Sequence, residues 1–419
     1  MKIIDVIRNF FISSAGQLIN AIYPIIVAKI IISNCGIDAF ASLGVTLSIL
    51  NILSLIIDYG SFLIGVKEVS INKENKDYLS RYLSTIYSFR LVILIPTLIL
   101  YFSYVYTFVE DKTIYYYSTL FFVSQLINPT WIYQGLEKFK QINVIILVSK
   151  LFYILFTFLF TKDRDSYVYN ILILALSNLF IYVVYFYKVS KIYDISIKNT
   201  SLRLIYKNAK DDFYIFINNL SISYYVNIPI VLVNYFIGPS AAGIYKIVDM
   251  ILSLSRSYLF VYFNVTYPRF CSIYKIDVLK SIKFLKTINT IHILTLFVGV
   301  VSAYFLMPYM IYFFVSENTD LRIVNTARYL IFIPIIIALN IPFYQFSLVE
   351  NLKMKIARLS FSGAILLSVI GILFIKYFQF NGVLYSIYLS EIYITIGMIL
   401  IALNYKRKDV AHSVNKTNF

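Results

Sequence analysis

Apolar stretches of about 20 residues, separated by short polar connections, recur along the whole chain. A helix of that length crosses a bilayer core of roughly 30 Å. None of the stretches alternates between apolar and polar residues, as strands of a membrane barrel do, and backbone groups in lipid are best satisfied within helices. The pattern predicts an all-α polytopic membrane protein with twelve spans, at residues 10–33, 39–66, 82–108, 113–134, 142–161, 167–187, 213–237, 241–266, 287–314, 325–349, 359–378 and 381–404.

The composition and the distribution of charge support this interpretation. Apolar residues make up 60% of the chain and charged residues 14%, whereas a soluble domain is nearer a quarter charged. With the N-terminus inside, the inner connections hold 26 Lys and Arg residues and the outer side 5, counting Lys376 at the outer end of its span. Positive charge gathers in cytoplasmic loops, so we expect both termini in the cytoplasm. This bias accounts for most of the net charge of +16, and no basic groove for nucleic acid is apparent.

Cysteine and histidine are too few to suggest a metal centre or a disulfide. In the predicted topology Cys35 and Cys271 lie on opposite sides of the membrane and cannot pair. The two histidines, His292 and His412, form no cluster of ligands, and His292 is expected near a cytoplasmic helix end. We therefore predict no metal and no cofactor.

Two stretches of the chain resemble each other. "NPTWIYQGLEKFK" at 128–140 and "NIPFYQFSLVENLKMK" at 340–355 share Asn, Pro, Tyr–Gln, Glu and Lys-x-Lys, at an offset of about half the chain. The offset predicts a duplication. Each half then has six spans and enters the membrane in the same direction, giving parallel repeats. We expect a bundle at 1–208, a second bundle at 209–404 and a basic cytoplasmic tail at 405–419.

Ionisable residues inside the predicted spans are candidates for function, because each costs at least about 2.5–3.5 kcal/mol to insert. Cations outnumber acids there, which favours an anionic substrate, although buried ion pairs between helices would also explain them. Lys29, like Arg328, is close enough to a helix end to reach the headgroups. The predicted substrate-binding residues are Arg90, Lys150, Arg256, Lys246 and Lys29.

The residues quoted so far resemble one known family. Pro129-x-Trp131-x-x-Gln134-Gly135-x-Glu137-Lys138 and Asp58-Tyr59-Gly60 are similar to motifs of the Wzx-type flippases for lipid-linked oligosaccharides. That family belongs to the superfamily that also holds the MATE drug exporters. The resemblance covers essentially the whole chain.

The resemblance implies a non-enzymatic transporter of the bacterial inner membrane. Such a protein moves an undecaprenyl-pyrophosphate-linked oligosaccharide between the leaflets by alternating access, coupled to an ion gradient. Further partners implied are membrane lipid, a polysaccharide polymerase and a chain-length regulator. It also suggests a cytoplasmic gate at Gln134, Glu137 and Lys138, for which a plain helix end and turn is the alternative.

A buried carboxylate can couple transport to a proton, because its charge responds to burial and to neighbouring cations. We expect Glu391 to serve first, Asp58 second, and Asp249 to be held ionised by Lys246 and Arg256 on its own helix face. Two rival functions remain at this point. A MATE-like drug antiporter would be expected to carry an acidic cavity, and a polymerase or glycosyltransferase would be expected to show a large outer loop or a carboxylate pair.

Overall fold

The structure is a computed structural model that describes residues 3–196, 202–274, 276–315 and 321–416. Within those ranges the chain is helical and contains no strand. By length and composition, nine of the helices in the described part could cross a membrane. The chain is thus an all-α polytopic membrane protein, as predicted.

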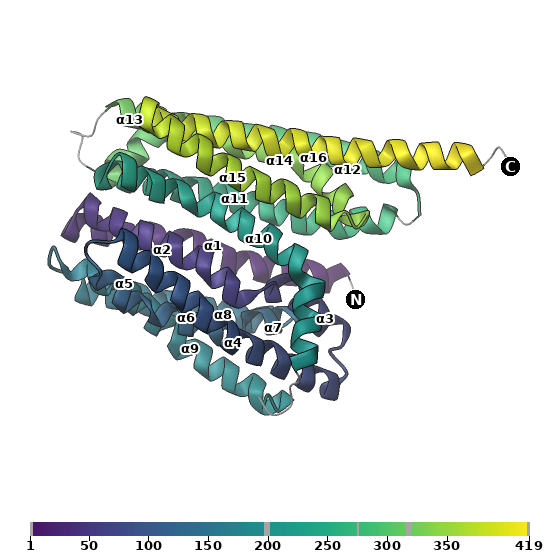
Figure 1. Ribbon diagram of the computed structural model, residues 1–419, viewed down its shortest axis with the longest axis horizontal. Helices are drawn as coiled ribbons and strands as arrows, with labels where there is room; N and C mark the ends of the chain where they lie inside the picture. The colour runs from purple at the N-terminus through teal and green to yellow at the C-terminus, as the bar shows by residue number, and fades with distance from the viewer. Residues whose placement is uncertain (1–2, 197–201, 275, 316–320, 417–419) are drawn as a thin grey trace. The chain divides into compact units, whose positions relative to one another are not determined.

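Each of the twelve predicted spans has a helical counterpart (Figure 1). Nine of the spans correspond to one long helix each, whereas the second, the fourth and the tenth are divided between consecutive helices. The helices are α1 Ile3–Cys35, α2 Ile37–Asp58, α3 Val66–Ile71, α4 Lys76–Phe108, α5 Thr113–Ser118, α6 Leu120–Leu126, α7 Thr130–Gly135, α8 Phe139–Phe160, α9 Asn170–Tyr193, α10 Leu202–Phe236, α11 Pro239–Tyr274, α12 Val278–Phe314, α13 Leu321–Leu330, α14 Ile333–Val349, α15 Lys353–Phe378 and α16 Phe380–Lys416.

The chain forms two compact units, Met1–Ser223 and Tyr224–Phe419. The boundary between them falls inside α10 rather than in a loop. At the other end of the second unit, α16 continues through the segment expected as a tail.

The second predicted span is broken, which the apolar pattern did not predict. α2 ends at Asp58, and the next two residues, Tyr59 and Gly60, have positive φ angles of 42° and 87°. Gly60 adopts this conformation without steric cost because it lacks a Cβ. The chain resumes as a π-helix at Ser61–Gly65 and then as α3.

The fourth predicted span is broken as well, at Asn128–Pro129. Pro129 has no backbone N–H to continue the helix. The side-chain oxygen of Asn128 instead accepts hydrogen bonds from the N–H and the hydroxyl of Thr130, at 3.1 and 2.7 Å. This local turn precedes α7, whose first flanking residue is Pro129, and it explains why Asn and Pro precede the tryptophan in the motif.

The two interruptions meet at close packing between α7 and the segment after α2. The Trp131 side chain is fully buried. A Cβ placed on Gly65 would come within 2.6 Å of the Trp131 ring, and one on Gly135 within 2.6 Å of Val69. Both glycines are therefore required for this close approach of the two segments.

The turns that follow α7 and α14 repeat each other, which supports the duplication. Glu137 and Asn351 both have positive φ angles, of 58° and 55°. In the first turn the Lys138 N–H donates to the Tyr133 carbonyl at 2.8 Å, and in the second the Leu352 N–H donates to the Ser347 carbonyl at 2.9 Å. The same backbone hydrogen-bond pattern thus closes both copies of the motif.

Candidate functional site

Arg90 and Asp58 form a buried ion pair in the first unit. The Arg90 Nη2 lies 2.7 Å from the Asp58 Oδ1, and the two side chains are 1% and 12% exposed. Asp58 is the last residue of α2, and its second carboxylate oxygen accepts from the Phe62 N–H beyond the break. The interruption of the second span thus places a carboxylate opposite α4.

The rest of the Arg90 guanidinium is held by the broken fourth span. Its Nη1 donates to the carbonyl of Leu126, the last residue of α6, at 3.3 Å. The guanidinium carbon also lies 5.5 Å from the ring centroids of both Tyr87 and Trp131. A cation at the carbonyl end of a helix and over aromatic faces is favourably placed. The two motifs quoted for the family resemblance therefore meet around Arg90.

Lys150 lies in a different environment. It is half-buried on α8, and its ammonium is 4.6 Å from the ring centroid of Tyr23 on α1. Tyr153 packs edge-on against Tyr23 at 6.0 Å. Among the described residues no carboxylate lies within ion-pair distance of Lys150. It is a deep cation that can still accept an anion.

In the second unit the polar stripe on α11 forms a compact cluster. Asp249 accepts from both Lys246, at 3.1 Å, and Arg256, at 2.5 Å. A further 3.2 Å hydrogen bond joins the Arg256 guanidinium to the Asp249 carbonyl. Spacing along one helix face predicted that these three residues lie together.

Glu391 belongs to the same cluster, although it comes from α16. Its side chain is 5% exposed and lies within electrostatic range of Arg256 and of the Tyr225 hydroxyl, which donates to the Ile387 carbonyl at 3.3 Å. The expected absence of a charged neighbour holds only for its own helix. The cluster has two cations and two acids, so the predicted surplus of cations is not found at this place.

The two cations expected nearest to helix ends are placed as follows. Lys29 is half-buried close to the end of α1. Arg328 donates from its Nε to the Tyr304 carbonyl at 3.2 Å and lies 4.3 Å from the Tyr304 ring. The binding role of Lys29 stays a prediction.

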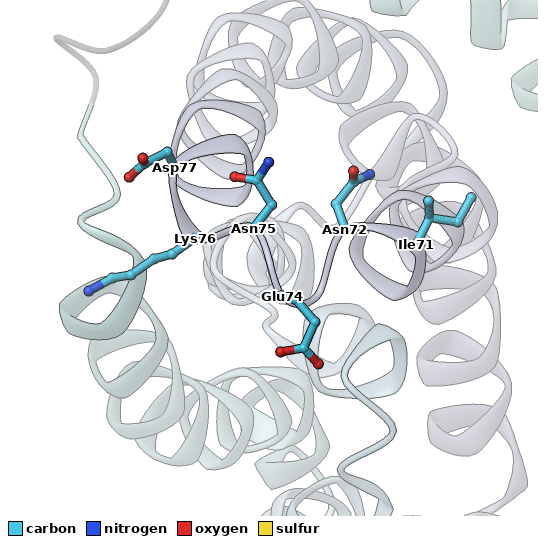
Figure 2. A pocket seen from close by; sticks show the side chains of 6 residues that line it. All are labelled: Ile71, Asn72, Glu74, Asn75, Lys76 and Asp77. Carbon is cyan, nitrogen blue, oxygen red and sulfur yellow. The ribbon is translucent and has the colours of Figure 1, made fainter. Parts of the chain in front are cut away.

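The residues expected to form a gate lie where α7 ends. Gln134, Glu137 and Lys138 are exposed, and Glu137 pairs loosely with Lys73 at 3.9 Å. Lys73 belongs to the connection between α3 and α4. Figure 2 shows the pocket of about 470 Å³ at this connection, where Glu74 points to the opposite side from Asn75. The gate therefore stays a prediction. Its residues lie beside the polar connection between α3 and α4, which is not part of the motif.

The second copy of the motif makes a comparable tie. Glu350, which follows α14, accepts a hydrogen bond from the Tyr274 hydroxyl at the end of α11. In the first copy, Glu137 after the fourth span contacts the connection that follows the second span. In the second copy, Glu350 after the tenth span contacts the end of the eighth span. Tyr274 could not be identified from its sequence position alone.

The profile of the family described as "Polysaccharide biosynthesis protein" matches residues 6–274. The chain belongs to the polysaccharide biosynthesis protein family.

Two relatives of this family member carry the name "Putative O-antigen transporter". The protein of Escherichia coli (strain K12) is 22% identical over 67% of the chain and 68% of its own length. That of Shigella dysenteriae is 21% identical over 91% of the chain and 96% of its own length. A solved structure of a multidrug resistance MATE family transporter, in an inward-facing conformation, matches with a TM-score of 0.68 at 13% identity, covering 94% and 95% of the two chains. The family member therefore has the MATE fold and is a multi-pass membrane transporter.

Proposed function

We propose that this family member moves an undecaprenyl-pyrophosphate-linked oligosaccharide repeat unit from the cytoplasmic to the outer leaflet of a bacterial inner membrane. The family description and the names of the two relatives support this cargo. The bias of Lys and Arg toward one set of connections supports cytoplasmic termini. A polymerase and a chain-length regulator that act on the flipped product are the partners we expect.

The observation that carries an anionic cargo is the environment of Lys150. Its ammonium rests on the Tyr23 ring, and no carboxylate among the described residues neutralises it at ion-pair distance. A partly buried charge without a partner in the membrane is unfavourable, so an anion that enters the bundle would be bound favourably. A pyrophosphate supplies that charge, and Lys binds it as a point charge.

Arg90 and Arg256 contribute to binding in a second way. Each is tied to a carboxylate, Asp58 or Asp249. A pyrophosphate can take over either guanidinium only when its pair opens. The Arg90–Asp58 pair joins α4 to α2, so opening it frees the two helices to move, whereas the Arg256–Asp249 pair lies within α11 and can open by a side-chain rearrangement. Cargo binding is then linked to a change of state through its different affinity for the two arrangements. Lys246 and Lys29 complete the proposed set of cations.

We assign the coupling role to Glu391 ahead of Asp58 and Asp249. Asp58 and Asp249 are each held directly by a cation. Glu391 forms no ion pair with a cation of the described residues and interacts with Arg256 only electrostatically. Its Gln variant is expected to bind the cargo and to lose the response to an ion gradient. Gln134, Glu137 and Lys138 are proposed to gate the cytoplasmic side.

Surface polysaccharide in a strain that lacks its own transporter gene tests the cargo proposal. Lys150→Ala should abolish the polymer while the protein still inserts, and Lys150→Arg should retain part of it because the charge remains. Lys112→Ala removes an ammonium outside the helices and serves as the matched control, with normal polymer expected. Normal polymer in the Lys150→Ala strain would refute the role of Lys150 and the argument for an anionic cargo that depends on it.

A further inference from the structure

One buried ionisable side chain is used neither by the cation pattern nor by the proposed coupling group. His292 lies on α12 and is 3% exposed. α12 begins at Val278, well before the predicted start of the span at residue 287. His292 is therefore about four turns inside the helix, and the prediction that it lies near a helix end was wrong.

The duplication gives His292 a counterpart. α4 and α12 start in the same way, because the side chains of Asn75 and Asp277 each accept from the backbone N–H three residues later. Arg90 follows its cap by 15 residues (75 to 90), and His292 follows its cap by 15 residues (277 to 292). His292 thus occupies in the second unit the helix position that Arg90 occupies in the first.

The two positions have similar aromatic surroundings but different charges. The His292 ring stacks on Tyr262 at 3.6 Å and 7°, and on Tyr258 at 5.1 Å and 24°. Both tyrosines come from α11, the repeat counterpart of α2, which supplies Asp58 to Arg90. Aromatic faces stabilise a cation. No carboxylate of the described residues lies within ion-pair distance of His292. Its positive charge, unlike that of Arg90, depends on whether the ring has bound a second proton.

Hydrogen bonds around the ring determine which nitrogen is free. The Thr295 hydroxyl donates to the His292 carbonyl at 2.9 Å, so its oxygen must accept from the Tyr258 hydroxyl, 2.8 Å away. The Tyr258 oxygen is then the acceptor for the His292 Nδ1–H, at 3.3 Å. The proton of the neutral ring is on Nδ1. Nε2 keeps its lone pair, and it is buried without a hydrogen-bond partner in the described structure.

Other charged groups around this part of α12 are engaged elsewhere or distant. On α11, the Arg269 guanidinium lies over the Phe284 ring at 5.7 Å. α13 contributes Arg328, bound to the Tyr304 carbonyl about three turns farther along α12. α14 faces the preceding turns of α12 with Pro342, Phe343 and Phe346, around a cavity of about 350 Å³ that Lys286 and Asn289 also line.

From these observations we infer that His292 binds a proton at Nε2 during the transport cycle, as the switchable counterpart of the fixed charge on Arg90. Its part in transport rests on the proposed function. Protonation creates an Nε2–H that has no acceptor in the described arrangement, and a buried donor without an acceptor is costly. The protonated protein therefore favours an arrangement of α11 and α12 that supplies an acceptor. Proton uptake biases the two states in this way.

Nuclear magnetic resonance of ¹⁵N-labelled histidine tests proton binding without any cargo. The chain has two histidines, so the His412→Gln variant reports on His292 alone. We expect the Nδ1–H tautomer at high pH and conversion to imidazolium as the pH is lowered. Tyr258→Phe should weaken the tautomer preference, whereas Tyr309→Phe, at an exposed site on α12, should not. A ring that stays neutral at every pH at which the protein remains folded, or that carries its proton on Nε2, would overturn the inference.

Proteoliposomes test the link to transport. With an undecaprenyl-pyrophosphate-linked disaccharide as the probe, an imposed pH gradient should accelerate the wild type and the His412→Gln control. His292→Gln and His292→Arg should transport at the same rate with and without the gradient. A normal gradient response in His292→Gln would overturn the inference. If the wild type does not move the probe, the proposed cargo fails, while the histidine titration still decides whether His292 takes up a proton.

Discussion

The Arg90–Asp58 pair allows the energetics of the site to be predicted most directly. Arg90→Met removes the guanidinium and leaves the Asp58 carboxylate, 12% exposed, without its counter-charge. Breaking a buried pair in this way costs about 3–5 kcal/mol. Asp58→Asn should also destabilise the protein because Arg90 loses its counter-charge. The hydrogen bond across the helix break is kept, because the amide oxygen can still accept from the Phe62 N–H.

The double variant distinguishes a lost charge partner from lost packing. Replacing both members of a buried pair is often close to neutral, so Arg90→Met with Asp58→Asn should recover most of the lost stability. The difference between the double variant and the sum of the singles is then a favourable coupling of at least about 2 kcal/mol. Some loss should remain, because Arg90 also donates to the Leu126 carbonyl and packs on Trp131.

Urea unfolding in detergent, followed by tryptophan fluorescence, measures these free energies. The single tryptophan, Trp131, lies next to Arg90 and reports on the site itself. The Asp277–Lys280 pair, whose lysine side chain is 80% exposed, is the matched control, and an exposed pair should show little coupling. The reasoning is refuted if the double variant is no more stable than Arg90→Met, or if both cycles give the same coupling.

Three further predictions concern packing, acid stability and topology. Gly65→Ala should destabilise the protein by about 1–3 kcal/mol, because its Cβ would come within 2.6 Å of the Trp131 ring. Gly299→Ala, whose Cβ would meet nothing within 4 Å, should be neutral or stabilising. An equal decrease in melting temperature for both variants would contradict the packing argument. Hydrogen bonding to the Lys280 N–H holds the pKa of Asp277 below its usual value. The wild type should therefore have a higher melting temperature than Asp277→Asn above about pH 4 and should lose that advantage as the pH falls through the lowered pKa. An advantage that does not change with pH would contradict this prediction. Reporter fusions should be periplasmic after residues 36, 111, 164, 239, 319 and 379, and two or more cytoplasmic results would break the twelve-span topology.

The sequence was sufficient to predict the all-helical membrane class and suggested the duplication, because both depend on patterns along the chain. Apolar length identifies a membrane helix. The repeated Asn, Pro, Tyr–Gln and Glu positions indicated two copies of one turn, and the backbone hydrogen bonds of Lys138 and Leu352 show that turn twice. Polar residues at helical spacing, such as Asp249 and Arg256, were also correctly expected to lie on one face.

Pairing between helices could not be predicted in the same way. Arg90 and Asp58 were each recognised as residues out of place in a membrane, but their contact depends on the helix break at Tyr59 and Gly60. Such a break requires positive φ angles, and a hydrophobic profile does not show them. Glu391 on α16 likewise interacts electrostatically with Arg256 on α11, which no spacing along one helix encodes.

The depth of His292 was misjudged for a related reason. The apolar window starts at residue 287, yet Asp277 caps the helix well before that residue. The intervening turns carry lysines at 280, 283 and 286, which lower the hydrophobicity without ending the helix. A helix boundary is set by its cap, so the cap at Asp277 was the signal that would have placed His292 correctly.

The most direct test of the central claim is to measure leaflet exchange of the cargo itself. Purified protein is reconstituted into vesicles with a labelled undecaprenyl-pyrophosphate-linked oligosaccharide, and an external glycosidase removes whatever reaches the outer leaflet. The account predicts rapid exchange of the oligosaccharide with wild type and slow exchange with Lys150→Ala. For a cationic drug loaded into the same vesicles, the two proteins should give the same rate of movement. Movement of the drug without exchange of the lipid-linked oligosaccharide would contradict it.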